Sequence, residues 1–272
     1  LQNSQLFADW PEWGGSPQKN NISTAKNIPH DWDVESGKNI RWSIPLGSET
    51  YGNIVVSQGK IFIGTNNGSG FLPQYPPSTD LGVLLCVRES DGKRLWQHSI
   101  PKLPTGRLHD WPNIGVCSTP LVHGNRLWYV TNRGEVACLD TEGFLDGENN
   151  GPVTDEVDNG PEDADVIWLF DLMSQLAVSQ HNMCSSSVTA AGDLLFLNTG
   201  NGVDLSHEHI PSPEAPSFLC MNRLNGHVVW ADSSPGTNIL HGQWSSPAIL
   251  QSDETSQVIF GGGDGWVYGF SL

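Results

Sequence analysis

The sequence predicts an all-β fold, a β-propeller of four-stranded antiparallel blades, and three observations lead to that prediction. One pattern recurs four times: an apolar strand opening on small residues, a turn with Gly, a second apolar strand, a turn, and a third strand. The 30 Gly and 18 Pro among 272 residues favour many short strands and turns. Each expected sheet is apolar on both faces, so it can be buried only between neighbouring sheets, as propeller blades are. The tryptophans that close the repeats are Trp42, Trp96, Trp168 and Trp230.

The elements follow the repeat in order. Residues 1–39 are expected to be an irregular lead-in, because Gly and Pro interrupt residues 9–17. The blades are expected at about 53–98, 119–171, 187–232 and 247–271. The expected strands are 53–57, 60–64, 82–88 and 93–98 in the first blade, 119–123, 126–131, 135–140 and 165–171 in the second, 187–191, 193–198, 217–222 and 227–232 in the third, and 247–251, 257–262 and 266–271 in the fourth.

The fourth blade has only three expected strands of its own. The segment Ile40–Pro45 contains Trp42 but follows no strands, so it could supply the missing outer strand and close a four-bladed ring. The alternative is that the four blades are part of a seven- or eight-bladed propeller.

Charge and hydropathy exclude two classes of partner. The chain has 13 Lys and Arg against 30 Asp and Glu, a formal charge of −17 that would repel a phosphate backbone, so nucleic acid is not expected. There is no apolar run of about 18 residues, so no transmembrane segment is expected. Since the chain begins at Leu1 rather than Met, we expect that it has been processed or excised from a longer product.

The five cysteines follow the repeat. Cys86, Cys138 and Cys220 occupy the same place in the third strands, and Cys117 and Cys184 both precede a first strand. No two are adjacent and none forms Cys-X-X-Cys, so we expect buried thiols that pack as small apolar groups, without a disulfide.

Two segments resemble a known family. Residues 84–96 and 218–230 are similar to the tryptophan-docking repeat of pyrroloquinoline-quinone-like propellers, and residues 140–146, 241–247 and 261–270 resemble exported quinone-like propellers of planctomycete-type bacteria. The resemblance implies a periplasmic or otherwise extracytoplasmic protein. The resemblance does not decide whether a cofactor is bound. Quinoprotein dehydrogenases bind a quinone and calcium, whereas the related barrel-assembly lipoproteins share the fold without a cofactor.

The cofactor that the resemblance suggests lacks support in the residues. Quinoprotein dehydrogenases hold pyrroloquinoline quinone with a Trp floor, a vicinal disulfide and a calcium ion, yet no two cysteines of this chain are adjacent. The stretch 146–151 begins like a calcium loop, but Val157 stands where the bidentate Glu would be expected. The residues themselves therefore predict no cofactor, and pyrroloquinoline quinone or calcium is the alternative that the resemblance implies.

Propeller geometry brings several connections to one mouth of the central channel. A concave mouth lined by imidazole, amide and indole groups is the usual place for a ligand. The two long insertions 66–81 and 201–216 are expected to stand over it, and the acidic insertion 140–165 is expected as solvated surface on the opposite face. The candidate ligand-binding residues are His109, Trp111, His181, Asn182, His241, Gln243 and Trp244.

A weaker metal site is predicted in the second insertion. His207 and His209 could offer imidazole ligands beside Asp204 and Glu208. Such a pattern is more often found in a solvated polar loop that binds no metal.

No nucleophile with its base is recognisable in the sequence. The favoured hypothesis is thus a non-catalytic exported propeller that binds a protein, a glycan or a small ligand. One alternative is a quinone- or metal-dependent oxidoreductase with its site at the channel mouth. Another is a cell-surface carbohydrate-binding module, because Trp111 and Trp244 could stack on sugar rings.

Overall fold

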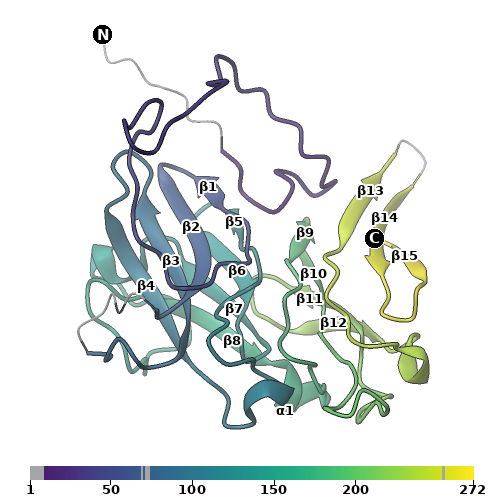
Figure 1. The fold of residues 1–272 in the computed structure, drawn as a ribbon. Coiled ribbons are helices and arrows are strands. Elements are labelled where there is room, and N and C mark those ends of the chain that lie inside the picture. The colour runs from purple at the N-terminus through teal and green to yellow at the C-terminus, as the bar shows by residue number, and fades with distance from the viewer. Residues whose placement is uncertain (1–8, 69, 71–73, 253–254) are drawn as a thin grey trace.

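The computed structural model describes residues 9–68, 70, 74–252 and 255–272. These residues form four antiparallel sheets, one per predicted blade, which follow one another along the chain (Figure 1). In each sheet the strands pair in chain order. The strands are β1 (Val55–Ser57), β2 (Lys60–Asn66), β3 (Leu81–Arg88) and β4 (Arg94–Pro101), then β5 (Leu121–His123), β6 (Arg126–Val130), β7 (Glu135–Asp140) and β8 (Val166–Asp171), then β9 (Thr189–Ala191), β10 (Leu194–Asn198), β11 (Phe218–Asn222) and β12 (Val228–Asp232), and finally β13 (Ala248–Gln251), β14 (Ser256–Gly261) and β15 (Val267–Ser271).

Helices are short. The α-helix α1 (Leu172–Leu176) follows β8, and three 3-10 turns cover Gly106–Leu108, Gly143–Asp146 and Gly236–Asn238. Within the described ranges no helix is long and apolar enough to cross a membrane.

The cores lie between neighbouring sheets, which confirms the predicted all-β propeller fold. One cluster joins Phe62 of the first sheet to Leu127 and Tyr129 of the second. A second joins the second and third sheets, and a third joins Phe196 and Phe260 of the third and fourth. Since the second and third sheets each contribute to the cores on both of their sides, neighbouring blades stabilise one another.

The recurrent cysteines have a packing role. Cys86, Cys138 and Cys220 each lie opposite the tryptophan of the next strand, and each is followed by a break in the strand register. All three are fully buried, and all five cysteines are free. A small side chain is needed there because the facing indole fills the space across the pair.

The closing tryptophans dock on the following blade. The indole Nε1 of Trp96 donates to the carbonyl of Thr141 at 3.0 Å, and that of Trp168 donates to the carbonyl of Arg223 at 3.2 Å. Both side chains are buried, at 0% and 5% exposed. Trp230 is only partly buried, and its ring packs 5.0 Å from that of Phe270 in β15.

The segment Ile40–Pro45 does not complete the fourth blade. It contains no strand, and the fourth sheet has the three strands β13, β14 and β15. The indole Nε1 of Trp42 instead donates to the carbonyl of Glu89 at 2.8 Å, so it docks on the first blade as Trp96 docks on the second. The expectation of a strand closing a four-bladed ring is therefore not met by the described residues.

The described part of the lead-in, residues 9–39, contains no helix or strand beyond isolated bridges, and residues 10–17 cross the inner strands of all four blades. Trp10 and Val56 exchange backbone hydrogen bonds, and Pro11 accepts from the amide of Val122. The buried carboxylate of Glu12 accepts from Thr189 at 3.0 Å and pairs with Lys19. The carbonyl of Pro17 accepts from the amide of Ile249. Residues 10–17 therefore lie at the central channel.

The acidic insertion is not simply solvated surface. The amide of Gln97 in β4 donates to Glu162, and the carbonyl of Gln97 accepts from Ala164, so the insertion pairs with the outer edge of the first blade. Arg94 adds an ion pair to Glu162, and Tyr75 donates to Asp158. The insertion thus covers an edge strand that would otherwise present unpaired backbone groups.

Candidate ligand pocket and histidine cluster

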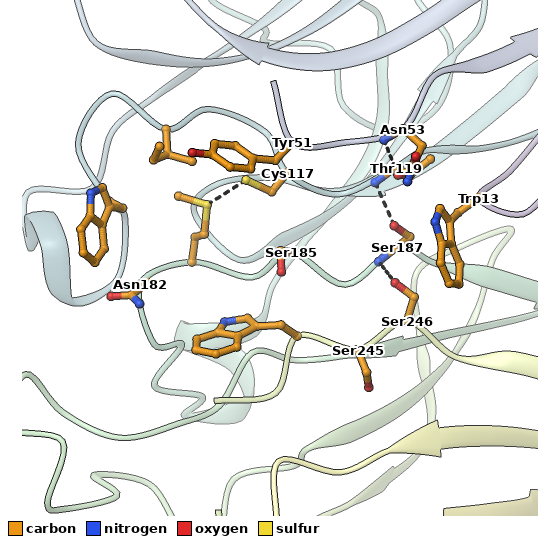
Figure 2. A pocket seen from close by; sticks show the side chains of 14 residues that line it. Trp13, Tyr51, Asn53, Cys117, Thr119, Asn182, Ser185, Ser187, Ser245 and Ser246 are labelled. Atoms are coloured by element: carbon orange, nitrogen blue, oxygen red, sulfur yellow. Dashed lines mark hydrogen bonds between the residues drawn. The ribbon is translucent and has the colours of Figure 1, made fainter. Parts of the chain in front are cut away.

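A pocket of about 890 Å³ occupies the channel between the inner strands. Its walls come from all four blades and from the lead-in, and Figure 2 shows Asn182 and Trp13 at its two ends. The lining residues are Trp13, Tyr51, Asn53, Trp111, Ile114, Cys117, Thr119, Asn182, Met183, Ser185, Ser187, Trp244, Ser245 and Ser246.

A ladder of hydroxyl groups links the blades along one wall of this pocket (Figure 2). The amide of Asn53 donates to Thr119 Oγ1 at 2.9 Å, the amide of Thr119 donates to Ser187 Oγ at 3.1 Å, and the amide of Ser187 donates to Ser246 Oγ at 2.9 Å. These four residues occupy equivalent positions just before the inner strands. Because the hydroxyl oxygens already accept from backbone N–H groups, their own hydrogens remain available for a ligand acceptor.

A second ring of equivalent positions lies two residues earlier. It consists of Tyr51, Cys117, Ser185 and Trp244, all of which line the pocket. Burial raises the pKa of the Cys117 thiol to about 12, and its Sγ lies 3.3 Å from the sulfur of Met183. A thiol with such a pKa is mostly protonated at neutral pH, so it reacts slowly.

The loops at the mouth are held together by backbone hydrogen bonds. The amide of Trp111 donates to the carbonyl of Asn182 at 2.9 Å, and the amide of Asn182 donates to Leu108 at 2.7 Å. Lys102 donates to the carbonyls of Trp111 and Ile114, so it fixes the loop that carries the indole. The guanidinium of Arg107 lies 3.9 Å from the ring of Trp111. The indole of Trp111 is thereby held at the pocket.

Three histidines gather beside the pocket. The Nε2 atoms of His181 and His241 lie 2.9 Å apart, and ring nitrogens of His181, His207 and His241 all lie within 4.8 Å of one another. His181 is fully buried, whereas the other two are exposed. Trp244 packs on this histidine cluster, with its ring 5.0 Å from that of His241, and its Nε1 donates to the carbonyl of His181.

Burial lowers the pKa values of His181 and His241, and neighbouring imidazoles lower them further. For His181, a hydrogen bond to the carbonyl of Val203 acts in the opposite direction. The cluster therefore favours neutral imidazoles, which have a free lone pair.

The structure separates the predicted site residues into three groups. Trp111, Asn182 and Trp244 line the pocket, and His181 and His241 belong to the histidine cluster together with His207, one of the two predicted metal ligands. The remaining three residues take part in neither: His109, His209 and Gln243.

These three have other contacts. His109 Nε2 lies 3.4 Å from Ser179 Oγ, and Gln243 is buried with its Oε1 accepting from the amide of Gly263. His209 lies in solvent beside Asp204, 3.7 Å away. His109 and Gln243 therefore contact neighbouring loops, whereas His209 faces solvent.

Sequence reasoning missed Trp13, the pocket-lining role of Cys117 and the ladder. The ladder could have been found by aligning the four repeats, because its residues share one position. Trp13 has no counterpart in the repeat, so no pattern pointed to it.

Of the three groups that the resemblance implies for a bound quinone, the pocket offers only indoles. Among its described lining residues there is no carboxylate for calcium and no adjacent cysteine pair. The donor set therefore does not fit a calcium-bound quinone at this position.

Comparison with known proteins supports the fold. No model of a known protein family matches the sequence, and no curated protein matches it. Among solved structures, the quinohemoprotein alcohol dehydrogenase from Comamonas testosteroni is similar over 99% of this chain and 40% of its own, with a TM-score of 0.59 and 12% identity. A europium-containing methanol dehydrogenase is similar over 97% of this chain and 47% of its own, with a TM-score of 0.55 and 10% identity.

The chain thus spans less than half the length of these two enzymes. Identities of this size show the fold alone. Together with the docked tryptophans and the sheets that pack face to face, they show that the chain has the pyrroloquinoline-quinone-like propeller fold.

Proposed function

We propose that this protein is a non-catalytic, extracytoplasmic propeller that binds a small uncharged ligand with a ring in its channel pocket. The observation that carries the proposal is the composition of the pocket: three indoles, a phenol, hydroxyls and amides, with no charged side chain among the described lining residues. Such a wall suits a molecule that offers an apolar ring face and hydroxyl groups, because indoles stack on the face while amides and hydroxyls bond its edge.

A neutral glycan is the ligand class that matches both features. Sugar rings present C–H faces to indoles and hydroxyl edges to Asn and Ser. Asn53, Asn182 and Ser185 supply donors and acceptors around the rim, and Trp111 and Trp244 supply stacking surfaces. The pocket volume of about 890 Å³ lies within the range of small-molecule sites.

The test is a screen of the purified chain on a panel of neutral glycans, followed by calorimetry with the best binder. Trp111→Ala should reduce the affinity by about fivefold or more, because a stacked aromatic pair contributes on the order of 1 kcal/mol. Trp266→Ala is the matched control, since this indole is 71% exposed in the fourth blade and lies outside the pocket. Equal losses in the two variants, or no glycan bound by the wild type, would refute the proposal.

The second candidate is the quinone-dependent oxidoreductase, which rests on the fold shared with the two dehydrogenases. A quinone bound to the purified protein would show a redox-active absorption band. Its presence would favour this candidate despite the unfavourable donor set.

Exposed apolar side chains on the fourth sheet support a further proposal, that this sheet packs against a protein partner or against further blades of a seven- or eight-bladed ring. The fourth sheet leaves Trp266 and Val267 each 71% exposed, and Leu250 51% exposed. Apolar side chains gathered on one sheet commonly mark a surface that packs against another element.

A further inference from the structure

The histidine cluster lies outside the proposed ligand pocket and has a chemistry of its own. Its members come from three separate segments. His181 lies between the second and third blades, His207 in the insertion after β10, and His241 between the third and fourth blades. The ring centroids are 4.6 to 4.9 Å apart, and one ring nitrogen of each imidazole lies within 4.8 Å of those of the other two.

The hydrogen bond of His181 defines which of its nitrogens faces that point. Its Nδ1 lies 2.7 Å from the carbonyl oxygen of Val203. A carbonyl oxygen can only accept, so Nδ1 carries the hydrogen and Nε2 carries a lone pair. This Nε2 lies 2.9 Å from Nε2 of His241. A backbone carbonyl that fixes the far nitrogen of an imidazole is the usual outer partner of a metal-bound histidine.

We propose that His181, His207 and His241 bind a divalent first-row transition metal, with Zn²⁺ as the favoured ion, through their ring nitrogens. A single hydrogen bond between His181 and His241 would explain two of the imidazoles but not the third. His207 reaches the cluster from an exposed loop with φ of 63°, a conformation that a non-glycine residue adopts at a cost. A bound ion offsets that cost by joining all three rings.

The ligand set also decides the class of metal. Three imidazoles without a thiolate or carboxylate suit Zn²⁺, Cu²⁺ or Ni²⁺ and are poor ligands for Ca²⁺ or Mg²⁺. The group comprises three donors among the described residues. A tetrahedral ion held by three histidines keeps its fourth position for water or an added ligand.

This inference does not depend on the proposed function. Trp244 packs between the two sites, lining the pocket and contacting His181 and His241. Failure of glycan binding would leave the metal site untouched, and Trp111→Ala should leave metal affinity unchanged.

The experiment uses the full chain after treatment with a chelator. Zn²⁺ is titrated by calorimetry, and Co²⁺ is added as a spectroscopic probe because four-coordinate Co²⁺ absorbs strongly in the visible range. The wild type should bind one ion. His207→Ala and His241→Ala should each weaken binding by at least about 100-fold, the upper end of what loss of an outer partner alone costs.

His209→Ala is the matched control. His209 lies in the same loop, two residues from His207, is exposed, and stands outside the cluster. It should leave both the affinity and the Co²⁺ spectrum unchanged. A wild type that binds neither ion, a His207→Ala variant that binds as the wild type does, or a His209→Ala variant as weak as His207→Ala would overturn the proposal. Because His207 is exposed, its variant should fold, and circular dichroism verifies this.

Discussion

The docking of Trp96 on the second blade provides a quantitative test of how the blades hold together. Its indole is 0% exposed, donates to the carbonyl of Thr141 at 3.0 Å, and packs with its ring 5.8 Å from that of Phe62. Replacement by Ala removes the buried ring and leaves a cavity between two blades. Such truncations cost about 3–5 kcal/mol. The carbonyl of Thr141 also loses its indole donor.

Two variants separate the contributions. Trp96→Phe keeps most of the apolar contact but removes the Nε1 donor, so we expect a loss of about 1–2 kcal/mol in the free energy of unfolding. Trp96→Ala should lose about 3–5 kcal/mol. For a domain of this size, each kcal/mol lowers the melting temperature by about 2–4 °C.

The assay is urea unfolding followed by circular dichroism, with Trp266→Ala as control. Trp266 is 71% exposed, so its truncation should change stability by less than about 0.5 kcal/mol. Equal stability of Trp96→Ala and Trp266→Ala would refute the docking argument. Equal losses in Trp96→Phe and Trp96→Ala would show that the hydrogen bond, rather than burial, dominates.

Three further predictions concern a histidine, a thiol and a glycine. Burial lowers the pKa of His98 to about 4, and its Nδ1 lies 2.6 Å from the hydroxyl of Tyr129. The unfolded chain therefore binds the extra proton first, and stability should fall by about 2 kcal/mol as pH drops from 6.5 to 4. The decline should be smaller in His98→Gln, and an unchanged pH profile would contradict the assignment. Cys117 lines the pocket, so a bound ligand should slow its labelling by a thiol reagent. Cys86 is fully buried and should be labelled only when the protein unfolds. Labelling of Cys117 at the same rate with and without ligand would contradict the pocket assignment. Gly226→Ala should lower the free energy of unfolding more than Gly37→Ala does. Both glycines have positive φ, but only at Gly226 would the new Cβ meet an indole, that of Trp168 at 2.8 Å. Equal losses in denaturant unfolding would mean that backbone strain alone determines the cost.

The repeat predicted the blades well but extended their first strands by one or two residues. The expected first strands began at 119 and 187, whereas β5 and β9 begin at Leu121 and Thr189. The reason is that the amides of Thr119 and Ser187 bond hydroxyls of the following blade rather than a strand in their own sheet. Hydrophobic patterning reports side-chain burial, so it cannot distinguish these two uses of an extended backbone.

The lead-in shows a different limit of sequence reasoning. Residues 10–17 bond the inner strands of all four blades through scattered backbone contacts and one buried carboxylate. Neither leaves a periodic signal, because no side-chain alternation accompanies an irregular segment. The segment around Trp42 shows the same limit, because the repeat identified the indole that docks on the first blade but predicted a strand where the chain is irregular.

The candidate sites differ in how they relate to the repeat, and that difference explains which parts were predictable. One position of the repeat is occupied by Tyr51, Cys117, Ser185 and Trp244, so the fold brings these side chains together whatever their type. The differences among the four side chains determine the chemistry of the pocket. The histidine cluster, in contrast, does not follow from the repeat, because His207 comes from an insertion that has no counterpart of similar sequence in the other blades. His209 offered the same chemistry in the same loop but faces solvent beside Asp204. Sequence spacing could therefore locate a loop able to supply a metal ligand, while only the path of that loop over the mouth selects His207.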